Sequence, residues 1–248
     1  MIDTRHLVDR EILPMLDMPD VVLTPETLAE VRANPLFTGD DLPPAPFPIT
    51  EARAPVEGGP DARLVVIDPP SDKRGRGAIL HIHGGGMVVG TADNAGKTKW
   101  DLAEDHDCVI VSVDYRLCPE NPFPAPQEDC YAGLVWLAEH ADELNVDPDR
   151  IVCMGESAGG CLAASLAQMT RDRGGPRLAG QVLIYHAWEP YQYRNWQPYD
   201  AAIPGMIKWL HLAGGYGHLN FWRNNWQPQQ ADRAIAVEVE KAAAEEVA

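Results

Sequence analysis

The sequence predicts an α/β fold with a mainly parallel, doubly wound sheet. Along residues 64–185, short apolar or β-branched runs alternate with helical stretches, a pattern typical of a sheet covered by helices on both faces. The length of 248 residues fits one large domain of this kind. Hydrophobic residues make up 45% of the chain and charged residues 23%, which separates it from a disordered protein.

Two helices are expected before the sheet, within residues 3–34. Thr24, with a proline and a glutamate directly after it, provides the N-cap, first position and acidic first turn of the second helix. The segment 42–48 (LPPAPFP) is too rich in proline for regular structure and is interpreted as a linker. The predicted domains are helices and linker at residues 1–50 and an α/β core at residues 51–248.

Five strands and three helices are expected in the core. Each strand is a short apolar or β-branched run bounded by turn residues. The strands are expected at residues 64–67, 78–82, 109–113, 151–154 and 181–185, and the helices at residues 94–106, 126–143 and 158–171.

The character of the sequence changes after the last predicted strand. The segment 186–226 holds five of the seven tryptophans and has no clear strand pattern. Its aromatic side chains could line a pocket for an apolar substrate, or could form a rebuilt cap that packs on the sheet. An Ala/Glu-rich helix is expected at residues 231–248.

Charge and cysteine content exclude several classes of partner. The formal net charge of -17, without a local Lys/Arg cluster, argues against nucleic acid, because phosphates repel an acidic surface. The five cysteines form no CxxC pair and no Cys/His ligand spacing, so we expect free thiols in a reducing compartment and no metal. The N-terminus does not resemble a signal peptide, and no apolar run reaches membrane-spanning length. We expect a cytoplasmic protein.

Gly155-Glu156-Ser157-Ala158-Gly159 matches the G-x-S-x-G pattern of a nucleophile elbow. The motif directly follows a predicted strand and opens a predicted helix, which is the context that the elbow requires. Small residues on either side of Ser157 let neighbouring backbone approach while the serine projects above the sheet edge. Ser157 is therefore the candidate nucleophile.

A glycine-rich loop, His83-Gly84-Gly85-Gly86, follows the strand predicted at residues 78–82. Successive glycines free backbone N–H groups to point at a developing oxyanion. A phosphate-binding loop is the alternative, but no Lys-Ser/Thr follows the glycines. Together with the elbow, the loop predicts one part of an oxyanion hole, and the N–H of Ala158 provides the other.

Three motifs in this order resemble the hormone-sensitive lipase family of α/β-hydrolases. They are HGGG, then DYRLCPE at residues 114–120, then GESAGG at residues 155–160, and the resemblance covers about residues 64–185. FPAPQED at residues 123–129 also resembles the family's segment, whereas Cys118 stands where the family has alanine.

The resemblance implies an eight-stranded hydrolase sheet with an N-terminal helical cap and the hydrolysis of carboxylic esters. It further implies an oxyanion hole formed by Gly85, Gly86 and Ala158, with no cofactor and with a small-molecule ester as the binding partner. Short-chain esters are the family's expected substrates, and a homodimer is the candidate assembly. Glu156, beside the nucleophile, is interpreted as a residue of the site wall and not as a catalytic acid.

The base and the acid of the triad are harder to assign, because the chain is short after residue 185. The resemblance implies the order Ser, acid, His, and the segment at residues 217–221 resembles the family's histidine signature in a disturbed form. His218 is therefore the candidate base, with His186 in reserve, whereas His211 is interpreted as a surface or packing residue. Asp200 is the candidate acid and Glu189 its alternative. Two strands expected between nucleophile and base are missing or rebuilt.

Two other interpretations predict little or no turnover. One is a non-catalytic ligand-binding member of the fold, similar to plant hormone receptors that keep the pocket and lose the triad. The other is a catalytically impaired scaffold that has lost its last strands, since loss of the base costs several orders of magnitude in rate.

Overall fold

The strands form one mixed sheet in the order β1-β2-β4-β3-β5-β6. The protein is represented by a computed structural model that describes residues 9–11, 13, 24–35 and 38–184. β2 is antiparallel to β1 and β4, whereas β4, β3, β5 and β6 run parallel to one another. The predicted doubly wound, mainly parallel sheet is confirmed. The strands are β1 (Thr50–Ala54), β2 (Ala62–Ile67), β3 (Arg76–Ile82), β4 (Val109–Asp114), β5 (Val146–Glu156) and β6 (Gly180–Ile184).

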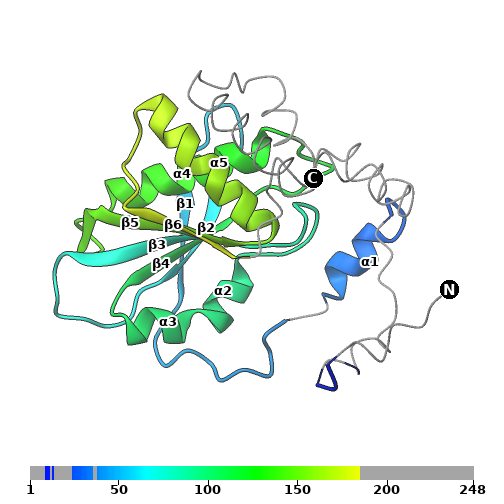
Figure 1. The fold of residues 1–248 in the computed structure, drawn as a ribbon, viewed down its shortest axis with the longest axis horizontal. Coiled ribbons are helices and arrows are strands. Elements are labelled where there is room, and N and C mark those ends of the chain that lie inside the picture. Colours follow the sequence, from blue (N-terminus) through cyan, green and yellow to red (C-terminus); the bar gives the residue numbers. More distant parts are fainter. Residues whose placement is uncertain (1–8, 12, 14–23, 36–37, 185–248) are drawn as a thin grey trace, which may run out of the picture. The chain divides into compact units, whose positions relative to one another are not determined.

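Helices cover both faces of this sheet. Figure 1 shows α4 and α5 over one face and α2 and α3 over the opposite face. This arrangement follows from parallel strands, because each connection between them must cross one face of the sheet. The helices are α1 (Leu28–Ala33), α2 (Asp93–Thr98), α3 (Trp100–Asp105), α4 (Ala125–Glu139) and α5 (Ala158–Arg173).

The core consists of two apolar layers, one on each side of the sheet. On β2, Leu64 faces α4, where a Cβ built on Gly133 would touch it. The next residue, Val65, belongs to a buried cluster on the other face, together with Ile67 and Ala95 of α2. Side chains alternate between the two faces along a strand, so buried strands covered on both faces are apolar throughout.

One predicted helix is divided in the structure, and one observed strand was not predicted. The helix expected at residues 94–106 is interrupted at Lys99, whose φ of −128° lies outside the helical range, so α2 and α3 are separate. β1 was not predicted, because its sequence TEARA has no apolar run and most of its residues are exposed or half-buried. It forms by pairing with β2 at the edge of the sheet.

The proline-rich segment 42–48 is irregular, as predicted, but it packs against the core. Phe47 is 7% exposed and belongs to the cluster beneath α2 and α3. The indole N–H of Trp100 donates to the Pro43 carbonyl at 3.1 Å. The segment therefore contributes to the α/β core as well as leading into it.

The chain divides into two compact units, residues 1–38 and residues 39–248. Within the first unit, the described helix begins at Leu28 instead of directly after Thr24. The Thr24 hydroxyl still accepts the backbone N–H of Thr27 at 3.3 Å, as expected of a capping residue. The domain boundary at residue 50 stays a prediction.

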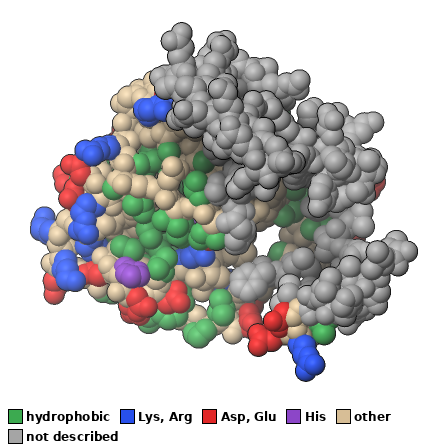
Figure 2. Space-filling model, viewed as in Figure 1, with side chains coloured by type: hydrophobic (Ala, Val, Ile, Leu, Met, Phe, Trp, Pro, Cys, Tyr) green, Lys and Arg blue, Asp and Glu red, His purple; other side chains and the backbone are tan. Residues whose placement is uncertain are grey.

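Acidic and basic side chains intermix on the face shown in Figure 2, around a central hydrophobic region. Several charged side chains of the described residues form ion pairs, such as Arg63 with Glu51 at 2.7 Å and Arg173 with Glu128 at 2.7 Å. In the part of the chain that the structure describes, no helix combines the length and apolar character needed to span a bilayer.

Candidate active site

Ser157 is the single residue between a strand and a helix. β5 ends at Glu156 and α5 begins at Ala158. The backbone of Ser157 has φ 52° and ψ −118°, a conformation that costs a residue with a side chain about 1–3 kcal/mol. The strand-to-helix turn is therefore as sharp and strained as the G-x-S-x-G motif predicts.

Close backbone packing explains the glycine at the end of this motif. A Cβ on Gly159 would overlap the carbonyl oxygen of Ile82, the last residue of β3. The first turn of α5 thus lies directly against the end of β3, where the glycine-rich loop begins. This contact brings the two predicted motifs together.

The glycine-rich loop turns back on itself beside the nucleophile. Gly85 has a φ of +113°, and its carbonyl accepts the N–H groups of Val88 and Val89, each at 3.0 Å. A Cβ on Gly84 would lie 3.4 Å from the Cβ of Ser157. The loop therefore begins in contact distance of the serine side chain.

Three backbone N–H groups near Ser157 have no backbone acceptor among the described residues. Ala158 is the first residue of α5, so its N–H has no carbonyl within the helix to bond. Within residues 38–184, no backbone carbonyl accepts the N–H groups of Gly85, Gly86 or Ala158. Donors of this kind are suited to a developing negative charge.

His83 is held at the base of the loop in a neutral form. Its Nδ1 lies 2.7 Å from the Gly84 carbonyl oxygen, which requires a proton on that nitrogen. Burial lowers the pKa of His83 to about 4. Its Nε2 is buried and has no hydrogen-bond partner among the residues that the structure describes.

Glu156 directs its carboxylate into the protein. Oε2 lies 2.9 Å from His81 Nε2, and Oε1 lies 2.9 Å from Lys99 Nζ. Burial opposes ionisation, but the contacts with His81 and Lys99 outweigh it and lower the pKa of Glu156 to about 2. Both oxygens of the predicted wall residue are thus engaged by other side chains.

Three residues near Ser157 were not among the predicted site residues: His81, Lys99 and Ser112. The sequence held a signal for His81 and Ser112, since each is a polar residue in an otherwise apolar strand. Buried polar side chains in such strands need hydrogen-bond partners. The Nδ1 of His81 lies 2.8 Å from the Ser112 hydroxyl on the neighbouring strand.

Two charged residues of the DYRLCPE segment form hydrogen bonds with neighbouring elements. Asp114 accepts the backbone N–H of Ala92 at 2.9 Å. Arg116 donates to Asp129, which is fully buried on α4, through its Nε at 3.0 Å and an Nη at 2.8 Å. Both residues therefore have structural partners.

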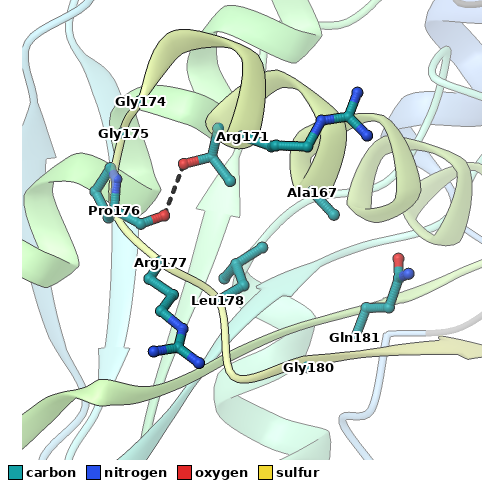
Figure 3. Close-up of a pocket in the computed structure, with 10 residues that line it drawn as sticks. Ala167, Arg171, Gly174, Gly175, Pro176, Arg177, Leu178, Gly180 and Gln181 are labelled. Atoms are coloured by element: carbon teal, nitrogen blue, oxygen red, sulfur yellow. Dashed lines mark hydrogen bonds between the residues drawn. The ribbon is translucent and has the colours of Figure 1, made fainter.

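A hollow of about 460 Å³ lies at the C-terminal end of α5 and in the loop to β6. Figure 3 shows Arg171, Arg177 and Gln181 around it, with a hydrogen bond from Thr170 to the Pro176 carbonyl at 2.7 Å. α5 has 16 residues and so measures roughly 24 Å from Ser157 to this end. The hollow is thus remote from the nucleophile.

Several predicted residues lie outside the described part of the chain. They are the candidate base and acid, His218 and Asp200, their alternatives His186 and Glu189, and His211. The same applies to the tryptophan-rich segment 186–226 and the helix expected at residues 231–248.

Comparisons with known proteins identify related hydrolases. The family described as alpha/beta hydrolase fold matches residues 79–211. Carboxylesterase NlhH of Mycobacterium tuberculosis is 37% identical over 181 residues, which are 72% of this chain and 56% of that protein.

Solved structures give a similar result. EstE1, a thermophilic carboxylesterase from a metagenomic library, is 41% identical with a TM-score of 0.54, over 65% of this chain and 52% of that one. A bacterial heroin esterase is 32% identical with a TM-score of 0.62, over 72% and 58%. The chain thus spans about half the length of the relatives that it matches.

Proposed function

Because the chain belongs to the α/β-hydrolase fold family, we propose that it is a carboxylic ester hydrolase acting through a serine acyl-enzyme. The family match and the esterase relatives confirm the resemblance that the motifs suggested. The observation that carries the proposal is the strained backbone of Ser157, together with the N–H groups of Gly85, Gly86 and Ala158, which no backbone carbonyl within residues 38–184 accepts.

In the proposed reaction, the Ser157 hydroxyl attacks the ester carbonyl and loses its proton to a histidine. The N–H groups of Gly85, Gly86 and Ala158 hold the resulting oxyanion. Collapse of this intermediate expels the alcohol, which takes up the proton, and leaves an acyl group on Ser157. Water then attacks the acyl-enzyme and releases the acid.

We assign the base to His218 and the orienting acid to Asp200. Both follow the nucleophile in the chain, in the order that the family resemblance implies. His83 is a poor base by comparison, because its Nδ1 proton is committed to the Gly84 carbonyl and its ring is buried. Glu156 does not compete with Asp200, since its carboxylate contacts His81 and Lys99.

The proposed substrates are small esters with short acyl chains. The relatives named carboxylesterase, esterase and ethyl acetate hydrolase support this class. The ordered HGGG and GESAGG motifs support a place in the hormone-sensitive lipase branch of the family. All five cysteines are buried and none is in a disulfide, which supports the expected cytoplasmic location.

Labelling with a fluorophosphonate probe and turnover of p-nitrophenyl acetate test the proposal. We expect rapid labelling of the full chain, and a loss of about 10⁴-fold or more in turnover on Ser157→Ala. Ser165→Ala is the matched control, because Ser165 lies on the same helix and its hydroxyl donates to the Leu162 carbonyl at 2.9 Å. It should label and turn over as the wild type does.

A wild type that neither labels nor turns over would contradict the proposal and favour the non-catalytic interpretations. If the wild type is active, His218→Ala and His186→Ala identify the base. Loss of activity in the first alone supports His218, whereas equal activity in both variants would exclude the assignment.

A further inference from the structure

Four polar side chains, two of them buried, form a connected network beneath the nucleophile elbow. Its centre is His81 on β3, which is 3% exposed. One ring nitrogen, Nδ1, lies 2.8 Å from the hydroxyl of Ser112 on β4, and the other, Nε2, lies 2.9 Å from Oε2 of Glu156. Lys99, between α2 and α3, completes the network with its contact to Oε1 of Glu156 at 2.9 Å.

The chemistry of the carboxylate fixes one proton of this network. A carboxylate only accepts hydrogen bonds, so Nε2 of His81 carries a proton and donates a hydrogen bond to Glu156. The other ring nitrogen, Nδ1, shares a hydrogen bond with the Ser112 hydroxyl. The order hydroxyl, imidazole, carboxylate is that of a hydrolytic triad.

This second arrangement cannot reach a substrate. Ser112 is 0% exposed, and it lies in the middle of the sheet, paired in register with His81. The network therefore acts on Glu156, whose backbone directly precedes Ser157.

We propose that the contacts of Glu156 with His81 and Lys99 hold the nucleophile elbow in its active geometry, so that Glu156 is a positioning residue for Ser157. The inference rests on the esterase function proposed above. A strained backbone conformation persists only where its surroundings hold it. Here the side chain before Ser157 is held from β3 and from the α2–α3 junction.

Two further contacts connect this anchor with the reacting groups. The N–H of Ser157 donates to the Ile184 carbonyl of β6 at 3.0 Å, which fixes the far side of the elbow. The Glu156 carbonyl lies next to the glycine-rich loop, since a Cβ on Gly84 would be 2.9 Å from its oxygen. Movement of Glu156 would therefore displace both the nucleophile and the start of the oxyanion loop.

Substitutions at Glu156 test the inference in the full chain. Glu156→Gln keeps an acceptor for His81 but loses the charge that faces Lys99, and Glu156→Ala loses both contacts. We expect kcat for p-nitrophenyl acetate, per titrated active site, to fall about 10-fold in the first and about 100-fold in the second, with KM nearly unchanged. The rate of fluorophosphonate labelling should fall in parallel.

Glu128→Gln is the matched control. It removes an ion pair of similar length, with Arg173 at 2.7 Å, on the outer surface of α4. We expect no change in kcat or labelling. A purely structural role for Glu156 would lower the melting temperature and leave kcat per titrated site at the wild-type value, which overturns the inference.

Substitutions of the partners provide independent variants. Lys99→Met and His81→Asn each remove one contact of Glu156, and each should lower kcat, with less than additive loss when combined with Glu156→Gln. They decide the question if Glu156→Ala fails to fold. Rapid labelling in the wild type and in every variant overturns the positioning role alone, whereas an unlabelled wild type overturns the esterase function and this inference with it.

Discussion

His83 stacks on Tyr115 with ring centroids 4.2 Å apart and ring planes 13° from parallel. The Tyr115 hydroxyl donates to the backbone carbonyl of His83 at 2.9 Å, so the same two residues are joined twice. This pair connects the start of the glycine-rich loop with the DYRLCPE segment. It also encloses the histidine and raises the cost of charging its ring.

Burial of His83 predicts a loss of stability in mild acid. The pKa of His83 is about 4 in the folded protein and about 6.5 in an unfolded chain. Below pH 6.5 the unfolded chain binds a proton that the folded protein does not, so the free energy of unfolding falls until pH 4. The contribution lost over this window is at most about 3 kcal/mol.

Urea denaturation at pH 7, 5.5 and 4.5 measures this effect. We expect the free energy of unfolding to fall more steeply, as the pH is lowered, in the wild type than in His83→Asn, which has no titrating ring at this position. His106→Asn is the control, because His106 is exposed, and it should keep the wild-type slope. Equal pH dependence of the free energy of unfolding in all three proteins would contradict the prediction, because His83 would then be protonated as readily in the folded state as in the unfolded chain.

Gly159→Ala is expected to destabilise the protein strongly. Replacing a helical glycine by alanine usually stabilises a helix by about 0.5–1 kcal/mol. Here the added Cβ would overlap the Ile82 carbonyl oxygen, and overpacking of this kind costs about 1–3 kcal/mol. Thermal unfolding should therefore show a lower melting temperature, and esterase activity should fall because the elbow shifts.

Gly180→Ala is the matched control for this substitution. A Cβ at Gly180 on β6 would lie 3.7 Å from the Val152 side chain, an ordinary contact. This variant should unfold close to the wild type. A Gly159→Ala protein of wild-type stability would mean that α5 can move away from β3 without cost.

The Arg116–Asp129 pair is expected to stabilise the fold much more than a surface ion pair does. Asp129 is fully buried, and the Arg116 guanidinium is its charged partner at 2.8 Å. Arg116→Met leaves this carboxylate without its partner, which costs about 3–5 kcal/mol. Arg171→Met removes an exposed pair with Asp172 and should unfold with the wild type. Equal melting temperatures in both variants would contradict the prediction.

The features that were predicted correctly are local in the chain. The strand Ile151–Met154, the serine elbow and the following helix are adjacent in sequence, so turn chemistry and apolar runs were enough to predict them. β1 was missed because its residues TEARA contain no apolar run, and its pairing with β2 joins segments that no local pattern connects. The break at Lys99 was missed because a single residue outside the helical range leaves the apolar pattern on both sides intact.

The role of Glu156 could not be predicted in this way. The sequence placed it beside the nucleophile and suggested a wall residue. Its partners His81 and Lys99 lie 75 and 57 positions earlier in the chain, and only the packing of β3 and the α2–α3 junction against β5 brings them within 2.9 Å.

The sequence by itself determined the strand-to-helix turn at Ser157 and the glycine-rich loop, because the backbone geometry of each depends on glycines and turns within a few residues. The tertiary structure alone decided how they are held. The contacts of Gly159 with Ile82 and of Glu156 with His81 join segments from different strands, and register and packing, which no local pattern encodes, fix them.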